Sequence, residues 1–293
     1  MKRKNTEGTD TLKKRSLWAD VWIRLRRNKL AMLGMIIIII LVFVSVFADF
    51  VAPYDYSTQD LSNTLQYPSL AHPFGTDNFG RDLLSRVIYG GRISLLVSVM
   101  AVCISLVIGG ILGAIAGYFG GILDTIIMRV MDIVMAIPGI LLAVCISAML
   151  GGGVWQTAIA ISIAGIAGTC RLLRATAMTI RGQEYVEAAR ASGASHFRIL
   201  FSNIIPNCLA PIIVNTTMSL GGNIMMISSL SFVGLGVQPP IPEWGSILNA
   251  GREFVRTFWP MITFPGIAIA LTMFAFNVFG DGLRDALDPK LKQ

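Results

Sequence analysis

Long stretches without any ionisable residue dominate this chain and alternate with short charged segments. The charge-free stretches are Leu30–Ala48, Ile93–Leu123, Ile133–Cys170, Ile199–Pro242 and Thr257–Gly280. About 20 apolar residues in a helix cross a hydrocarbon layer of roughly 30 Å. Because lipid offers no hydrogen-bond partners, each stretch is expected to satisfy its backbone groups within a helix. The pattern therefore predicts an all-α membrane protein.

Two of these stretches are longer than one crossing needs. The stretch Ile133–Cys170 is interrupted by Gly151–Gly153, and we expect two helices joined by a tight turn there. The stretch Ile199–Pro242 is expected to hold one helix, which begins after Pro206 and ends near Gly234. The chain is thus predicted to have six transmembrane helices.

Basic residues are distributed unevenly over this topology. Most of the 24 Lys and Arg residues lie before the first span, after the fourth span or in the tail. Since cytoplasmic loops are enriched in Lys and Arg, both termini are expected to be cytoplasmic, in a cell inner membrane. The predicted parts are a cytoplasmic basic segment 1–29, a first transmembrane helix 30–51, an external loop 52–92, a five-helix core 93–284 with a cytoplasmic loop 176–206, and a cytoplasmic tail 285–293.

Composition argues against an enzyme and against a bound metal or cofactor. The chain is 14% charged, and no Lys lies between Lys29 and Lys290, so the phosphate-binding loop G-x-x-x-x-G-K-[ST] is absent. His72 and His196 are predicted on opposite sides of the membrane and cannot share a metal ion. The net charge of +7 follows from the topology; it suits anionic lipid and requires no nucleic acid. Four single cysteines are expected to pack in apolar helices: Cys103, Cys145, Cys170 and Cys208.

The second and third spans contain small and charged residues that suggest specific contacts. Span two carries three glycines at a spacing of four: Gly109, Gly113 and Gly117. Such a face lets two backbones approach closely in lipid, and a gating role is the alternative. In span three, Arg129 and Asp132 are expected to pair on one helix face, with a role in lining the pathway as the alternative. Pro138 should kink this helix, either as a structural feature or as a hinge.

The segment 181–206 cannot cross a bilayer, although its composition favours helix. Its charged residues are Arg181, Glu184, Glu187, Arg190 and Arg198. Each would cost roughly 3 kcal/mol at the centre of a membrane. Gly193 is expected to end a first helix, because glycine adopts the left-handed terminal conformation freely. A second short helix is predicted from Ala194 to about Asn203, before Pro206.

Apolar and aromatic residues of this second helix are predicted to be exposed. Phe197 and Leu200 would share one face, with His196 and Ile199 adjacent. A protruding apolar face of this kind suits docking into a groove of a partner. The segment is therefore predicted to be a cytoplasmic helix–turn–helix that contacts another subunit.

Several motifs resemble one family of transporters. The pattern Glu187-Ala188-Ala189, followed by Gly193 and Ile205-Pro206, resembles the EAA loop of ABC importer permeases. Three further segments resemble the C-type permease of dipeptide and oligopeptide (peptide/nickel) importers: His72–Arg86, Ser231–Pro240 and Asn277–Pro289. The resemblance extends over most of the chain.

This resemblance implies a type I ABC importer permease fold, with one peripheral helix and a five-helix core. The chain would form half of a translocation pathway for peptides. Its partners would be a homologous second permease, two ATP-binding subunits that use ATP and Mg, and an extracytoplasmic solute-binding protein. The residues implied in coupling to the ATPase are Glu187, Ala188, Ala189, Gly193, Ala194, Ser195, His196, Phe197 and Leu200. Segment 238–256, with Trp244 and Glu253, would lie on the external face near the binding protein; an ordered re-entrant or interfacial loop is the alternative.

Other cargoes and other classes of protein are the alternatives. A permease of the same fold could import nickel complexes or glutathione, and no residue is assigned to substrate binding. An ion-coupled secondary carrier is the competitor from a different class, but such carriers usually place ionisable residues at the bilayer midplane. The central helices of this chain lack them. A scaffold that assembles other proteins is a third alternative.

Overall fold

The computed structural model describes residues 17–287 of the 293-residue chain. Within this range no strand forms, and the only β-type pairing is a single bridge between Thr76 and Asp82. The all-α prediction is therefore confirmed. Most of the predicted cytoplasmic segment 1–29 and of the tail 285–293 lies outside the described residues.

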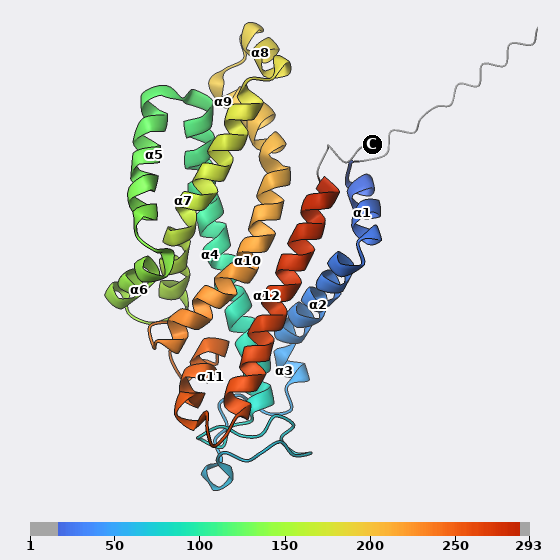
Figure 1. The fold of residues 1–293 in the computed structure, drawn as a ribbon, viewed down its shortest axis with the longest axis vertical. Coiled ribbons are helices and arrows are strands. Elements are labelled where there is room, and N and C mark those ends of the chain that lie inside the picture. The colour runs from blue at the N-terminus through green and yellow to red at the C-terminus, as the bar shows by residue number, and fades with distance from the viewer. Residues whose placement is uncertain (1–16, 288–293) are drawn as a thin grey trace, which may run out of the picture.

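Twelve α-helices and four short helical turns make up the described part of the chain. The helices are α1 (Leu17–Arg27), α2 (Lys29–Val46), α3 (Ala48–Val51), α4 (Leu83–Phe119), α5 (Gly121–Ala136), α6 (Gly139–Leu150), α7 (Val154–Arg181), α8 (Glu184–Ala191), α9 (His196–Ile199), α10 (Leu209–Phe232), α11 (Trp244–Gly251) and α12 (Pro260–Leu287). The turns are η1 (Leu61–Asn63), η2 (Leu200–Ile204), η3 (Ile205–Cys208) and η4 (Arg252–Phe254). Figure 1 shows the long helices side by side in one bundle.

Five helical segments of the described chain are long and apolar enough to cross a membrane. They are Lys29–Val46, Leu83–Phe119, Val154–Arg181, His196–Phe232 and Pro260–Leu287. The pair α5 and α6 makes a sixth span when it is counted as one, although it bends by 88°. The prediction of six spans holds in this sense only, because the third span is broken.

Pro138 explains the position of this bend. It lies between α5 and α6, with extended backbone at Ile137, and it has no N–H with which to continue the helical ladder. The expected kink is therefore present and is sharper than a kink within a continuous helix. The predicted tight turn at Gly151–Gly153 also forms, since α6 ends at Leu150 and α7 begins at Val154.

Helix α4 begins well before the charge-free stretch that predicted it. Asp82 caps its first turn by accepting a hydrogen bond from the Ser85 N–H at 2.7 Å. Two arginines lie within the helix because each has an acidic partner: Arg86 approaches Asp77 at 3.4 Å, and Arg92 approaches Asp49 at 2.9 Å. The predicted external loop 52–92 is thus too long, and the segment outside the helices ends at Asp82.

The three glycines of α4 form a close contact with α7. A Cβ atom added at Gly109, Gly113 or Gly117 would lie 2.6, 2.3 or 2.5 Å from carbonyl oxygens of α7. Contacts this short leave no space for any side chain. The packing interpretation of this glycine face is therefore confirmed, and we call the contact the glycine seam.

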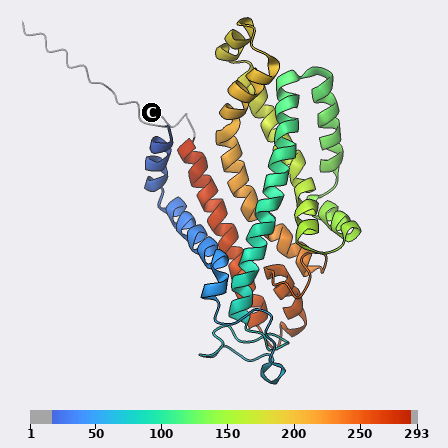
Figure 2. The same cartoon turned by 180° about the vertical axis from the view of Figure 1, so that it is seen from behind.

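The bundle has two distinct ends, which Figures 1 and 2 show from opposite sides. Segment 52–82 and α11 lie at one end, which we call the loop end. Helices α8, α9 and α1 lie at the other, which we call the α8 end, together with the last turn of α12. At the loop end, the Phe74 ring stacks on Phe264 of α12 with centroids 3.8 Å apart, and Tyr67 Oη donates to the Thr257 carbonyl at 2.8 Å.

The start of α11 is buried between helices rather than exposed. Trp244 is 2% exposed, and its Nε1–H donates to the Val87 carbonyl of α4 at 2.8 Å. Trp244 is therefore not part of the exposed surface at the loop end. Segment 238–256 contains the ordered helix α11, and Glu253 of η4 is exposed. That this segment lies on the external face stays a prediction.

The glycine seam yields a prediction about stability. Gly113→Ala should lower the thermal stability of the purified protein, because overpacking a helix contact costs about 1–3 kcal/mol. Gly110→Ala is the matched control, since its Cβ would meet nothing closer than the Leu106 side chain at 3.8 Å. The control should be neutral or stabilising, as alanine favours helix over glycine. Thermal unfolding followed by size-exclusion chromatography in detergent compares the two; equal midpoints would contradict the seam.

Candidate functional site

Helix α8 is a short polar helix that protrudes at the α8 end of the bundle (Figure 1). Its first turn holds Glu184 and Glu187 and its last turn holds Arg190, an order that complements the helix dipole. Val186 is its one buried residue and packs with Ile180 of α7 and Ile199 of α9. A single apolar anchor thus holds a helix whose remaining surface faces outward.

The turn after α8 depends on Gly193. This residue has φ +78°, and the neighbouring N–H groups close the helix end: Gly193 donates to the Arg190 carbonyl at 3.0 Å, and Ala194 donates to the Ala189 carbonyl at 3.1 Å. These two bonds form a Schellman motif, which requires left-handed backbone at the glycine. The predicted helix stop is confirmed.

Helix α9 begins at His196, and Ser195 caps it by accepting from the Arg198 N–H at 3.4 Å. The helix was predicted to run from Ala194 to about Asn203 as a separate element, and this was wrong. Instead, His196–Phe232 is one helical segment that passes through η2 and η3 into α10. Pro206 has no backbone N–H to donate to the preceding turn. The helical hydrogen bonding therefore changes to the π type in η2 and to the 3-10 type in η3, and the helix continues without a break.

Two phenylalanines form the exposed face at the start of this segment. Phe197 is 75% exposed and Phe201 is 60% exposed, one helical turn apart. Ile199 and Leu200 are 0% and 6% exposed and pack toward Tyr118 of α4. The expected exposure of Leu200 was therefore wrong, and Phe201 takes its place beside Phe197.

His196 connects this segment to the end of α4. Tyr118 Oη and His196 Nδ1 are 2.8 Å apart, and Tyr118 is 3% exposed. The Phe119 ring lies 5.7 Å from the His196 ring, so the imidazole has aromatic contacts as well. Sequence reasoning missed Tyr118, because the two partners are 78 positions apart and no local pattern joins them.

The charges around α8 have no partner within the described chain. Arg181, Glu187 and Arg190 line a shallow surface depression of about 390 Å³, and none of them forms an ion pair among residues 17–287. Ala188 is exposed and Ala189 is half-buried beside them. The site therefore consists of an aromatic pair next to unpaired charges of both signs, held on a capped turn. It offers a docking surface, and the described residues contain no group of side chains that could hold a metal ion.

Comparison with known families shows to which family this chain belongs. The family model described as "Binding-protein-dependent transport system inner membrane component" matches residues 109–293. A second model, the "N-terminal TM domain of oligopeptide transport permease C", matches residues 16–69. The chain belongs to the binding-protein-dependent permeases. It is a multi-span inner-membrane permease of an ABC importer and is not itself an enzyme. This excludes the ion-coupled carrier.

The permease has relatives, named for the compounds they transport, that match along nearly all of its length. It is 44% identical over 277 residues to the dipeptide transport system permease protein of Alkalihalophilus pseudofirmus, covering 94% of this chain and 91% of the relative. It is 45% identical over 279 residues to a di/tripeptide permease of Pseudomonas aeruginosa, covering 93% and 92%. It is 46% identical over 279 residues to a glutathione permease of Escherichia coli, covering 95% and 92%.

Solved structures show the same fold at low sequence identity. The MetNI methionine ABC transporter in inward-facing conformations matches with a TM-score of 0.58 and 18% identity, covering 69% of this chain and 96% of that one. An amino acid ABC transporter matches with a TM-score of 0.52 and 17% identity, covering 71% and 95%. The permease thus has the type I ABC importer fold that the sequence motifs implied.

Ion pairs hold α5 of the permease against α7. Arg174 donates to Asp124 through Nε and through Nη2, the second bond at 2.7 Å. Arg171 donates to Asp132 at 2.6 Å, whereas the predicted pair of Arg129 with Asp132 is only at 4.0 Å. The main partner of Asp132 was thus missed, because Arg171 lies in helix α7, 39 positions away along the chain.

The turn at Gly193 can be tested through its backbone conformation alone. Gly193→Val should destabilise the turn by about 1–2 kcal/mol, because a β-branched residue resists positive φ. Gly193→Asn should be tolerated, since asparagine adopts this conformation more readily. No atom lies within 4 Å of a Cβ built at Gly193, so steric contact does not confuse the comparison.

Hydrogen–deuterium exchange over residues 184–199 of the purified permease measures the effect. Exchange should accelerate in Gly193→Val and stay near wild type in Gly193→Asn. Gly182→Val serves as a control, because Gly182 has φ −83°. Unchanged exchange in Gly193→Val would show that the turn does not depend on its glycine.

Proposed function

We propose that this permease forms half of the translocation pathway of a peptide importer and receives the motion of an ATP-binding subunit through α8 and α9. One observation carries the coupling proposal. The exposed pair Phe197 and Phe201 lies at the start of an uninterrupted helical segment that continues through a membrane span, His196–Phe232. A displacement applied to these rings is therefore transmitted to the span through a continuous backbone.

We assign the residues of this site to three roles: anchors in the partner's cleft, contacts at its rim, and residues that shape the segment. Phe197 and Phe201 would fill an apolar cleft, since exposed aromatic side chains are frequent anchors of interfaces. Glu187 and the neighbouring Ala188 and Ala189 would meet the rim of that cleft. The remaining residues shape the segment. Gly193, Ala194 and Ser195 form the turn and cap, His196 links the segment to α4, and Leu200 packs beneath the exposed face.

The proposed complex contains a homologous second permease, two ATP-binding subunits that use ATP and Mg, and an extracytoplasmic solute-binding protein. The α8 end would be cytoplasmic, because α1 with Arg24, Arg26 and Arg27 lies at this end, beside the last turns of α12 (Figure 2). The N- and C-termini would then share the side of the ATP-binding subunits. The loop end would be external.

The loop end offers a surface for the solute-binding protein. Val255 and Trp259 are 54% and 48% exposed, and Arg252 and Glu253 of η4 are exposed beside them. Leu70 in segment 52–82 is fully exposed. Trp244 is not part of this exposed surface, because it is buried and holds α11 against α4. We propose this exposed rim as the contact for the external partner.

Peptides are the proposed cargo because two of the relatives carry peptide names and the N-terminal family model is that of an oligopeptide permease. Glutathione is the second candidate, on the relative that is named for it. ATP-driven uptake of a radiolabelled dipeptide, in proteoliposomes that hold the complete transporter, tests the cargo directly. Uptake of glutathione in the same vesicles, with no uptake of dipeptide, would overturn the peptide assignment.

Crosslinking tests whether α9 contacts the ATP-binding subunit. Ser195→Cys should crosslink to that subunit, because Ser195 is exposed at the protruding end. Ser62→Cys is the control, since Ser62 is equally polar and exposed but lies in η1 at the loop end. Both are made with Cys103 and Cys145 replaced by alanine, as these two are exposed. Failure of every single cysteine from 194 to 201 to crosslink would remove the docking proposal.

Truncation of the aromatic anchor tests the energetics of coupling. Phe197→Ala should weaken association with the ATP-binding subunit by about tenfold or more, as expected for an interface anchor worth roughly 2 kcal/mol. Phe43→Ala is the matched control, because Phe43 is 56% exposed on α2, outside the site. The affinity of the isolated ATP-binding subunit for the permease pair is measured in nanodiscs. Equal affinities for the two variants would contradict the proposed role of Phe197.

A further inference from the structure

Helix α10 carries a row of uncharged polar residues within its membrane span. Asn215, Ser219 and Asn223 follow one another at a spacing of four, so they share one face of the helix, and Thr216 lies beside them. Polar residues in a membrane span commonly find a partner on their own helix. Thr217 does so, because its Oγ1 donates to the Ile213 carbonyl at 2.8 Å.

The side chains of these four residues form no hydrogen bond within the described chain. They are half-buried, and no side-chain contact satisfies their amide and hydroxyl groups among residues 17–287. An unpaired amide in a hydrocarbon environment costs several kcal/mol, so these groups need water or a ligand. We call Asn215, Thr216, Ser219 and Asn223 the polar row.

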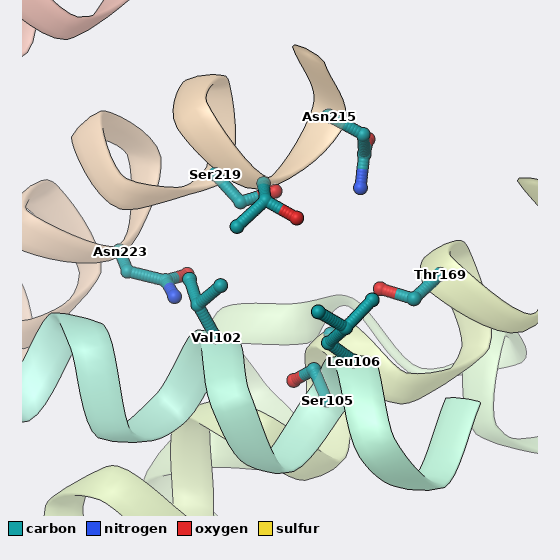
Figure 3. A pocket seen from close by; sticks show the side chains of 9 residues that line it. Val102, Ser105, Leu106, Thr169, Asn215, Ser219 and Asn223 are labelled. Atoms are coloured by element: carbon teal, nitrogen blue, oxygen red, sulfur yellow. The ribbon is translucent and has the colours of Figure 1, made fainter. Parts of the chain in front are cut away.

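The polar row faces a narrow cavity between three helices. Figure 3 shows Asn215, Ser219 and Asn223 from α10 opposite Ser105 of α4 and Thr169 of α7. The cavity has a volume of about 40 Å³, and none of the residues that line it is ionisable. The opposite wall of the cavity is formed by α4 and α7, so the polar row faces helices of its own chain.

A larger cavity lies beside the polar row, toward the α8 end. It has a volume of about 560 Å³ and is lined by α7, η3, α10 and the last turns of α12, including Arg284 and Leu287. Asn215 lines both cavities, so the two lie next to each other at the polar row. If the α8 end is cytoplasmic, as proposed above, this is a vestibule that opens toward the cytoplasm.

We propose that the polar row is a contact surface for the peptide backbone during translocation. This inference rests on the proposed function of the permease as a peptide importer. Asparagine amides both donate and accept hydrogen bonds, as do hydroxyls, so they match the N–H and C=O groups of any peptide bond. The absence of charge in the narrow cavity means that binding there would not depend on the charge of the peptide side chains.

The narrow cavity has room for water but not for a peptide, so the polar row has to move away from α4 and α7 during transport. The wall that can move is α10. Helices α4 and α7 contact each other along the glycine seam, whereas α10 is continuous with α9. A displacement of Phe197 and Phe201 would therefore shift the polar row directly and change the width of the cavity.

Two adjacent threonines give a matched experiment. Thr216→Val and Thr217→Val make the same isosteric change one residue apart, but only Thr216 lines the cavity. The complete transporter is reconstituted in proteoliposomes with its binding protein. Three quantities are measured: ATP-driven uptake of alanyl-alanine, ATP hydrolysis stimulated by the loaded binding protein, and copurification of the subunits.

Thr216→Val should lower dipeptide uptake by roughly 3- to 10-fold. This is the effect expected when one hydrogen bond between the Thr216 hydroxyl and the peptide is lost. Thr217→Val should stay within about twofold of wild type, because its hydroxyl bonds only to its own helix. Stimulated ATP hydrolysis and subunit copurification should be unchanged in both. Asn215→Leu is a second variant and should also lower dipeptide uptake. An ester analogue of the dipeptide lacks the amide N–H, so Thr216→Val should reduce its uptake less than it reduces uptake of the dipeptide.

The possible outcomes separate this inference from the proposed function. Wild-type uptake of dipeptide together with equal uptake by Thr216→Val, Asn215→Leu and Thr217→Val would overturn the role of the polar row and leave the importer intact. Loss of subunit copurification in Thr216→Val and Asn215→Leu would show that the row serves assembly, which also overturns it. Absence of ATP-driven dipeptide uptake by the wild type would overturn the proposed function itself.

Discussion

The need to satisfy every polar group inside a hydrocarbon layer governs this structure. Several charged residues of the long helices have a partner of opposite charge, as Arg174 has Asp124 and Arg92 has Asp49. Hydrogen bonding to Arg92 also holds the pKa of the Asp49 carboxyl below its usual value. The polar row on α10 departs from this pattern. Its unpaired amides and hydroxyls mark the place where something other than this chain completes the hydrogen bonding.

The same constraint separates a fixed part of the permease from a part that can move. Glycine contacts bring the backbones of α4 and α7 together over several turns, and substitution there has no space to relax. No such seam lies between α10 and the opposite side of the narrow cavity, which is hollow. The continuous segment His196–Phe232 therefore combines two properties that a lever requires. It has an exposed docking face at one end and a polar face along a space that it can widen or close.

Much of this fold could be predicted from the sequence, because lipid makes the pattern of charge-free stretches informative. The turn at Gly193 and the glycine seam followed from the backbone freedom and small size of glycine. The start of α4 could not be predicted, since Arg86 and Arg92 looked like loop residues until their distant acidic partners were located. Long-range pairing of this kind leaves no trace in a local pattern.

The coupling segment shows the same limit on a smaller scale. A sequence can place residues on a helix but cannot tell which face packs inward, and for that reason Leu200 was assigned to the face that Phe201 occupies. Tyr118 was missed because its contact with His196 joins the end of α4 to the start of α9. The burial of Trp244 was missed for a similar reason, as its partner is a backbone carbonyl of α4.

The far end of α10 determines how a displacement at α9 would spread. At the loop end, the fully buried carboxylate of Glu243 accepts from Ser94 of α4 at 3.0 Å and lies 3.4 Å from the Ser228 hydroxyl of α10. It also caps α11 by accepting from the Ser246 N–H at 3.0 Å. A buried carboxylate that lost these donors would be costly, so the three helices are held together at this point. The Ser98 hydroxyl of α4 also donates to the Leu220 carbonyl of α10 at 2.9 Å, in the middle of the polar row. A helix held to α4 over this stretch and pushed at its other end pivots. Asn215 and Thr216 lie between Leu220 and the docking face, so a pivot would move them first.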